Sequence, residues 1–260
     1  MQKVRGSELI EIAKKEGCKG VVFDNDKTIC KVSSAEYVGH KILGRELKRG
    51  NFQNVLEGLY GIMKIRMDII RNGGEEDASA LKTFCQTLGN TGCADRISLH
   101  YYAMENVKKN CFDGVDNFVN NAKKELGPAF LATNGLNFSA DATMYRCGMT
   151  GRVSNPPIYK VGNKRVKESP YAYVGQTSVI LPQDSLLVDC EVVMRRGPDK
   201  KKCLKNLLEP LNLDISEMLA IGDKYNIDKD FMDASLLSAA SPKAERKTRN
   251  NSHYQIASFD

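Results

Sequence analysis

The chain has 260 residues, of which 42% are apolar and 27% charged, with a formal net charge of +6. These values are ordinary for a folded globular protein, and the length allows one large domain or a core with a subdomain. No apolar run approaches the roughly eighteen residues of a membrane span, and residues 1–7 begin no apolar secretory segment. We therefore expect a cytoplasmic protein without a membrane partner.

The cysteines and the basic charge indicate neither a zinc site nor nucleic-acid binding. Zinc sites use short Cys and His spacings that this chain lacks, so we expect reduced thiols, most of them buried. The eight cysteines are Cys18, Cys30, Cys85, Cys93, Cys111, Cys147, Cys190 and Cys203. The surplus of Lys and Arg is modest and has no interleaved aromatic residues or known reading motif, so we expect no nucleic-acid partner.

The first part of the chain predicts a strand followed by a long helical block. Residues 8–16 have the pattern of a short helix, and the apolar run 20–23 is typical of a buried strand. From 31 to 111 the apolar residues recur at helical spacing, with a break at an Asn-Gly-Gly sequence in 72–74. The helices expected after this break cover 76–88 and 93–109.

The rest of the chain alternates between predicted helices and strands. Strands are expected at 129–132, 218–221, 237–239 and 254–257, and helices at 115–125, 137–147, 200–209 and 228–234. The segment from 153 to 193 predicts short hairpin strands, namely Ile158–Val161, Arg165–Lys167, Tyr171–Val174, Ser178–Ile180 and Ser185–Val188. This pattern is typical of an α/β protein with a doubly wound, Rossmann-like parallel sheet, whose ligands bind at the carboxyl ends of the strands. We assign residues 1–30 and 112–260 to this core and residues 31–111 to an inserted helical subdomain.

Asp24 and Asp26 follow the first predicted strand and are separated by one residue. Side chains at i and i+2 of an extended backbone point the same way, so the two carboxylates can share one small volume. Two anions this close repel each other unless a cation lies between them or one takes a proton. The pair therefore predicts a divalent metal and an acid-base pair, although Asp-x-Asp after a strand also occurs in solvated turns.

Further polar residues stand at later strand ends. Thr133 and Asn134 follow the second predicted strand of the core, Asp223 follows another apolar run and a Gly, and Lys200 begins a helical pattern between them. The carboxyl ends of parallel strands meet at one edge of a sheet. We therefore expect these side chains to lie near the first pair of acids.

This ordered set resembles the four motifs of the haloacid dehalogenase superfamily, and in particular its phosphatases with a helical cap, such as the phosphoserine phosphatases. The family motifs are Asp-x-Asp-x-Thr after a strand, Ser or Thr after a strand, a Lys, and Gly-Asp followed by a further Asp. The resemblance covers residues 18–30 and 112–245, whereas 31–111 agrees only in its helical character. It implies an α/β core of the haloacid dehalogenase type, with residues 31–111 as the cap.

The resemblance also implies a role for each motif residue in phosphate chemistry. Asp24 would attack phosphorus and become an aspartyl phosphate, and Asp26 would serve as general acid and then as general base. Thr133, Asn134 and Lys200, the first of three consecutive lysines, would bind the phosphoryl oxygens, and Lys200 would offset the negative charge.

The implied cofactor is Mg²⁺, which prefers oxygen ligands. By the resemblance, Asp24, the backbone carbonyl of Asp26, and Asp223 would be its protein ligands. Asp228 would support the site from the last motif, but its spacing differs by one residue from the commoner family pattern, and Asp230 is an alternative for this role.

The function implied is that of a Mg²⁺-dependent phosphomonoester hydrolase acting on a small phosphorylated metabolite. A phosphotransferase with the same chemistry and a non-catalytic binding protein of the same fold are the alternatives, and the complete motif set disfavours the second. Phosphoserine phosphatases carry a Glu nine residues after the nucleophile, where this chain has Ser33, and the nearest acid is Glu36. This difference argues against phosphoserine as the substrate.

Overall fold

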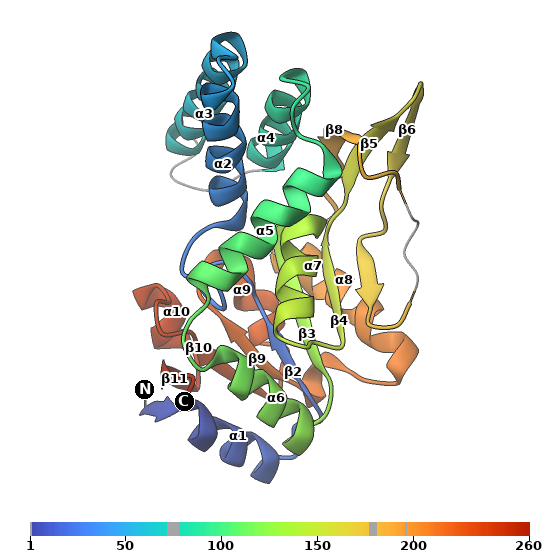
Figure 1. Cartoon of the computed structure of the whole chain (residues 1–260). Coiled ribbons are helices and arrows are strands. Elements are labelled where there is room, and N and C mark those ends of the chain that lie inside the picture. Colours follow the sequence, from blue (N-terminus) through green and yellow to red (C-terminus); the bar gives the residue numbers. More distant parts are fainter. Residues whose placement is uncertain (1, 72–77, 177–180, 196) are drawn as a thin grey trace.

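The computed structural model describes residues 2–71, 78–176, 181–195 and 197–260, and its centre is an eight-stranded sheet (Figure 1). The strands of this sheet are β1 (Gln2–Arg5), β2 (Val21–Phe23), β3 (Ala129–Leu136), β4 (Gly151–Asn155), β7 (Tyr171–Tyr173), β9 (Leu219–Gly222), β10 (Leu237–Ala240) and β11 (Tyr254–Ser258). Their order is β1-β11-β10-β9-β2-β3-β4-β7, and all neighbours are parallel except β4 and β7. The expected α/β fold with a mainly parallel sheet is confirmed.

Helices connect these strands, as the alternating sequence pattern predicts. They are α1 (Gly6–Lys15), α6 (Val115–Glu125), α7 (Asn137–Arg146), α8 (Gly197–Leu208), α9 (Tyr225–Met232) and α10 (Arg246–Asn251). Two short 3₁₀ turns, Glu209–Leu211 and Ile215–Glu217, lie between α8 and β9. Parallel strands need such crossover connections, because the chain must return to the starting edge of the sheet.

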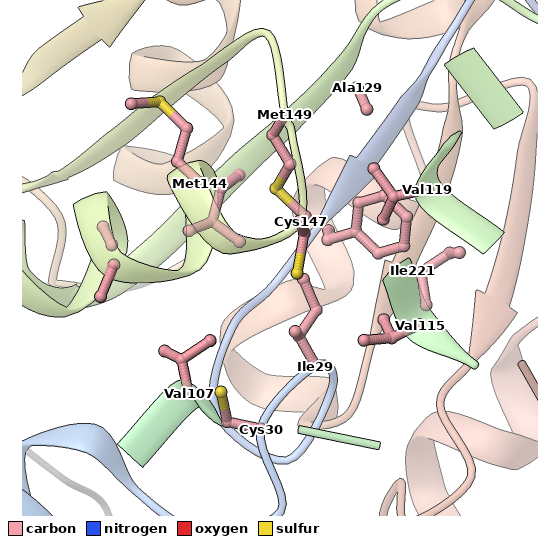
Figure 2. Close-up of a cluster of buried hydrophobic side chains, with 14 of the residues drawn as sticks. Ile29, Cys30, Val107, Val115, Val119, Ala129, Met144, Cys147, Met149 and Ile221 are labelled. Atoms are coloured by element: carbon pink, nitrogen blue, oxygen red, sulfur yellow. The ribbon is translucent and has the colours of Figure 1, made fainter. Parts of the chain in front are cut away.

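Both faces of the sheet are covered, since successive side chains of a strand point to opposite faces. Val21 and Phe23 of β2 belong to a buried cluster that includes side chains of α1, α6 and α7, whereas Val22 belongs to a second cluster with α8 and α9. Figure 2 shows part of the first cluster, with Val115 and Val119 of α6 beside the sheet. The sheet is therefore buried on both sides, and its strand ends are the places where polar groups can gather.

Four helices follow β2 and form the region between the first and second motifs. They are α2 (Ser34–Lys48), α3 (Phe52–Arg71), α4 (Ala78–Asn90) and α5 (Arg96–Asn110), which we call the helical block (Figure 1). The chain turns between α2 and α3 at Gly50, whose φ of 78° favours glycine, and the sequence pattern did not predict this break. The predicted break at 72–74 lies outside the described residues. No described helix is long and apolar enough to cross a membrane.

The predicted hairpin region contributes to two different sheets. Strands β5 (Pro157–Val161), β6 (Lys164–Lys167) and β8 (Leu186–Cys190) form a separate three-stranded antiparallel sheet in the order β6-β5-β8, which we call the insert sheet. The expected strand Tyr171–Val174 is β7, at the edge of the main sheet, and the expected strand Ser178–Ile180 lies outside the described residues. The hairpin prediction was therefore correct for the strands within the described residues but did not show that they belong to two different sheets.

The insert sheet is attached to the helical block by backbone hydrogen bonds. Leu187 donates its N–H to the carbonyl of Ala94 at 2.9 Å, and Arg96 donates its N–H to the carbonyl of Ser185 at 2.9 Å. The Arg96 side chain also forms an ion pair with Glu168 at 3.1 Å. The block is thus joined to the core at a point remote from its two chain linkers.

The edge strand β1, the strand β4 and the helix α10 are absent from the sequence prediction. The four residues of β1 are Gln-Lys-Val-Arg, and three of them are exposed, because β1 is the edge of the sheet and pairs only with β11 among the described strands. Helix α10 spans six residues of mostly charged and polar type. None of these segments has the apolar pattern on which the prediction depends, and in β4 Val153 is the single apolar side chain.

Candidate active site

The sheet register brings three of the predicted motifs to one edge of the sheet, on the side of the helical block (Figure 1). Strand β2 lies between β3 and β9, with Leu131 of β3 and Ile221 of β9 opposite its last residue. Asp24 follows β2 directly, Asp223 follows β9 directly, and Thr133 lies two positions beyond Leu131. Asp24 and Asp223 therefore follow the carboxyl ends of adjacent strands, whereas Thr133 lies inside β3, which extends beyond the expected end at residue 132.

Lys200 joins two of the acids through its ammonium group. Its Nζ donates to Oδ1 of Asp24 at 2.6 Å and to Oδ1 of Asp228 at 2.7 Å. Lys200 and Asp228 are fully buried, and Asp24 is 7% exposed. The other carboxylate oxygen of Asp228 accepts the backbone N–H groups of Asp223 and Lys224 at 3.0 and 3.1 Å. Asp228 thus ties Lys200 to the loop between β9 and α9.

The positive charge of Lys200 is stabilised by its surroundings. Burial alone would lower the pKa of this ammonium group, but the nearby carboxylates of Asp228 and Asp24 raise it. Its Nζ also lies 5.0 Å from the centroid of the Phe231 ring, a distance suited to a cation–π contact. The site therefore contains a fixed buried cation beside the carboxylate of Asp24.

The negative charges at this edge outnumber that cation. Asp24, Asp223 and Asp228 each place one carboxylate oxygen within 4.8 Å of the others. Burial raises the pKa of Asp24 to about 7 despite Lys200, and burial together with the charges of Asp24 and Asp228 raises the pKa of Asp223 to about 9. Carboxylates held this close are stabilised by a bound cation, and an all-oxygen donor set suits Mg²⁺. The residues present therefore fit a Mg²⁺ ion.

Asp26 is held at the start of the helical block rather than in the buried ion network. Its Oδ1 accepts hydrogen bonds from the hydroxyl and the N–H of Ser34 at 3.0 and 3.2 Å, and from the Asn25 side chain at 3.2 Å. Asn25 is itself fully buried and accepts a hydrogen bond from the Thr143 hydroxyl at 2.8 Å. These contacts fix the direction of the Asp26 carboxyl group relative to α2 and α7.

Thr133 and Asn134 offer polar groups near the same strand ends. The Thr133 hydroxyl oxygen accepts the N–H of Gly135 at 3.1 Å, which leaves its own proton for another acceptor. Among the described residues, the side-chain oxygens of Asn134 and Thr28 are buried without a hydrogen-bond partner. Buried polar atoms without partners are costly, and such atoms are frequent where a ligand or an ordered water binds.

The geometry favours Asp228 over Asp230 as the supporting acid. Asp228 contacts Lys200 and the Asp223 backbone, whereas the Asp230 carboxylate lies against Gly197 at the start of α8, where a Cβ would clash with it. Asn226, the residue that matches the family spacing, is exposed. The one-residue shift in the sequence is thus compatible with an acid in contact with Lys200.

Solved structures with a similar fold are found, although no family model and no curated protein matches the sequence. A phosphoserine phosphatase with an analogue of its phospho-aspartyl intermediate aligns with a TM-score of 0.60 at 15% identity, over 94% of this chain and 95% of that one. The hydrolase t0658 from Salmonella enterica serovar Typhi, described as a HAD family member, gives 0.59 at 16% identity, over 96% and 75%. A protein of unknown function from Bordetella pertussis Tohama I gives 0.64 at 14% identity, over 91% and 96%. The chain has the haloacid dehalogenase fold.

Within this haloacid dehalogenase fold, sequence reasoning missed the residues that orient the predicted ones. Asn25 and Ser34 hold Asp26, and Phe231 lies beside Lys200. In the sequence, Asn25 alone gave an indication of such a role. It is a polar residue just after an apolar strand, and in an extended backbone its side chain points away from those of its two acidic neighbours. A polar side chain buried at such a position requires hydrogen-bond partners, but the sequence does not say which.

Proposed function

We propose that this protein is a Mg²⁺-dependent phosphomonoester hydrolase that acts through an aspartyl phosphate. The observation that carries the proposal is the buried contact of Asp24 with Lys200, beside Asp223, at the carboxyl edge of the sheet. The fold supports it, because a phosphoserine phosphatase of similar fold was solved with an analogue of a phospho-aspartyl intermediate. The alternative of a phosphotransferase uses the same first step and differs in the acceptor.

Asp24 is the nucleophile in this proposal. Lys200 binds Oδ1 of Asp24 and so limits the rotation of the carboxylate, while the other oxygen attacks phosphorus in line with the ester oxygen. The new bond joins Asp24 to phosphorus as the bond from phosphorus to the leaving oxygen breaks. The attack needs Asp24 in its carboxylate form, so the raised pKa of Asp24 must fall again when a cation is bound at the site.

Asp26 transfers the protons. It protonates the leaving alkoxide in the first step and takes a proton from the water that attacks the aspartyl phosphate in the second. Asn25 and the Ser34 hydroxyl donate to Oδ1, and the Ser34 N–H donates to both oxygens, so the carboxyl plane is kept in one orientation. The same group therefore acts as acid and then as base without a change of position.

Thr133, Asn134 and Lys200 bind the transferring phosphoryl group in this proposal. The Thr133 hydroxyl and the Asn134 N–H donate to its oxygens, and Lys200 offsets the charge that Asp24 and the phosphate bring together. When bound, Mg²⁺ would be held by Asp24, Asp223 and the backbone carbonyl of Asp26 and would neutralise further negative charge. Asp228 acts through Lys200, because both of its oxygens already accept hydrogen bonds from the protein.

We propose a small phosphorylated metabolite as the substrate, because the helical block stands over the strand ends and is also attached to the insert sheet (Figure 1). Ser33, the residue before α2, stands where phosphoserine phosphatases carry a Glu, so the substrate need not carry an amine. A panel of phosphorylated sugars, hydroxy acids and nucleotides, compared by kcat/KM, identifies the class.

Hydrolysis of p-nitrophenyl phosphate with and without metal tests the proposed activity. We expect turnover with Mg²⁺, loss of turnover in EDTA, and recovery when Mg²⁺ is added in excess. Asp223→Ala should match the EDTA-treated enzyme even in Mg²⁺, whereas Asp184→Ala, a change at an exposed acid, should behave as the unmodified protein. Undiminished turnover in EDTA would contradict the metal-dependent part of the proposal.

A further inference from the structure

Cys30 and Cys111 lie on the two linkers that join the helical block to the core. Cys30 follows the loop that carries Asp26, and Cys111 follows the last residue of α5. The proposed phosphatase mechanism uses neither thiol. Their Sγ atoms are 3.7 Å apart, within hydrogen-bond distance for two thiols.

The backbone pairs these two residues directly opposite each other. The Lys31 N–H donates to the carbonyl of the residue before Cys111 at 2.7 Å, and the Phe112 N–H donates to the carbonyl of the residue before Cys30 at 2.9 Å. Cys30 and Cys111 are thus a non-hydrogen-bonded antiparallel pair, in which Cα atoms lie about 4.5 Å apart and side chains share one face. A disulfide accepts Cα separations of about 4.4–6.8 Å, so it can form here with little backbone movement.

The two thiols differ in their access to solvent. Cys30 is fully buried, whereas Cys111 is partly exposed. Hydrogen bonds from the thiols of Cys147 and Cys30 hold the pKa of Cys111 below the usual range of a thiol. The thiolate is the form that reacts with oxidants, so Cys111 is the accessible and reactive member of the group. Figure 2 shows Cys30 and Cys147 within the buried cluster, close to Ile29.

We propose that Cys30 and Cys111 form a reversible disulfide when a peroxide oxidises Cys111. The Cys111 thiolate attacks one peroxide oxygen, the O–O bond breaks, and the released oxygen leaves as hydroxide and takes up a proton to become water. The resulting sulfenic acid is attacked by the sulfur of Cys30, which loses its proton, and the S–O bond breaks as the S–S bond forms. Two thiols are oxidised by two electrons in total, and hydrogen peroxide is reduced to two molecules of water.

The disulfide would connect the two linkers next to the loop of Asp26. The carbonyl of Cys30 accepts the N–H of Lys27 at 2.6 Å, and the N–H of Cys30 donates to the carbonyl of Asn25 at 3.1 Å. Lys27 has a φ of 60° in this tight turn. A covalent bond at Cys30 therefore limits the movement of this loop relative to α5, as well as the movement of one linker past the other.

Two other thiols define what the experiment must separate. Cys147 is buried beside Cys111 and could form the bond instead of Cys30. Cys85 and Cys190 also share a hydrogen bond, but both thiols are buried. This pair is therefore an internal control that shows whether oxidation requires a solvent-exposed thiol. Under mild oxidation we expect this second pair to stay reduced.

Peptide mapping of the full-length protein without reductant tests the proposal. After treatment with a small excess of hydrogen peroxide, we expect one cross-linked species that joins the peptides of Cys30 and Cys111, and its complete reversal by dithiothreitol. Cys111→Ser should abolish the cross-link and leave Cys30 as a free thiol, whereas Cys85→Ser should cross-link as the unmodified protein does. A bond between Cys111 and Cys147, equal oxidation of Cys85 and Cys190, or peroxide-treated protein with both linker thiols free would overturn the proposal.

Hydrogen exchange tests the effect on the linkers without reference to phosphatase activity. The amides of Lys31 and Phe112 should exchange several-fold more slowly in the oxidised protein than in the reduced protein, and Cys111→Ser should show no such change on peroxide treatment. If Cys111→Ser does not fold, peptide mapping and hydrogen exchange of the unmodified protein still show whether the disulfide forms and whether it restricts the linkers. Equal exchange rates in cross-linked and reduced protein would refute the restriction of the linkers.

Discussion

The candidate active-site edge and the contact between helical block and insert sheet both join distant parts of the chain, but they use different interactions. At the sheet edge, Asp24 and Asp228 share the buried ammonium group of Lys200, so charged side chains define the geometry. At the insert sheet, Ala94 and Ser185 take part through their backbone carbonyls. The difference means that charged residue types are required at the first place, while the backbone hydrogen bonds at the second set no requirement on the side chains of Ala94 and Ser185.

The largest expected effect of a single change is at the sheet edge. Asp24→Asn keeps the shape of the side chain but removes the proposed nucleophile, so we expect kcat to fall by roughly 10³-fold or more with the fold intact. Asp230→Asn, a change at the acid that packs against Gly197, should stay within a few-fold of the unmodified enzyme. Initial rates with p-nitrophenyl phosphate and circular dichroism spectra measure both. Near-normal turnover of Asp24→Asn would remove the basis of the proposed mechanism.

The stability of the metal-free protein should depend on pH because of the same acids. The pKa values of Asp24 and Asp223 rise in the folded state from 3.8 to about 7 and about 9, so the folded protein binds their protons more tightly than the unfolded chain. This contribution to stability is complete below about pH 4 and is lost as the pH rises through those values. We expect Tm in EDTA to fall over this range, and Mg²⁺ to raise it again at the alkaline end.

A matched pair of variants tests the origin of that pH dependence. Asp223→Asn removes the carboxyl group with the higher raised pKa, so the decrease of Tm with pH should become shallower. Asp184→Asn, at an exposed position, should leave the slope as it is. Thermal melts at several pH values in EDTA provide the comparison, and an unchanged slope in Asp223→Asn would assign the dependence to other groups.

The smallest predicted effect concerns the insert sheet. Glu168 accepts hydrogen bonds from Arg96 at 3.1 Å and from Asn137 at 3.0 Å, and its side chain is 11% exposed. Glu168→Ala leaves both donors without this partner and should cost about 1–3 kcal/mol of unfolding free energy. Lys14→Ala, which breaks the mostly exposed pair with Glu125, should cost about 1 kcal/mol or less. Urea unfolding of the two variants measures the difference, and equal losses would show that the Glu168 contacts are no stronger than a surface pair.

The same contrast explains what the sequence could predict. The proximity of Asp24 and Asp223 could be predicted because buried strands and rare polar patterns are both visible in the sequence, and parallel pairing brings strand ends together. The contact of Lys200 with Asp24 agrees with the expectation that this lysine lies near the first pair of acids. The hydrogen bonds that attach the helical block to the insert sheet through the carbonyls of Ala94 and Ser185 were not predictable, because backbone hydrogen bonds leave no residue pattern. The separation of β7 from the insert sheet was hidden for the same reason.

Residues that act through another residue were the hardest to predict. Ser34 holds Asp26 and is the first residue of α2, but in the sequence it is one of two adjacent serines at a helix start, where Ser is common as a cap. The choice between Asp228 and Asp230 also needed the structure, since only the fold shows which acid faces Lys200. Long-range contacts of this kind depend on packing, which local sequence patterns do not contain.

Detection of the phosphorylated enzyme tests the central claim most directly. Enzyme quenched in acid during turnover of p-nitrophenyl phosphate should carry one phosphoryl group, which peptide mapping assigns to Asp24 and which hydroxylamine removes, as expected for an acyl phosphate. This phosphoryl group should be absent from Asp24→Asn and from enzyme treated with EDTA. A phosphoryl group on any other residue would contradict the account. So would the absence of phosphoenzyme from samples in which enzyme and excess substrate are quenched before the first turnover is complete.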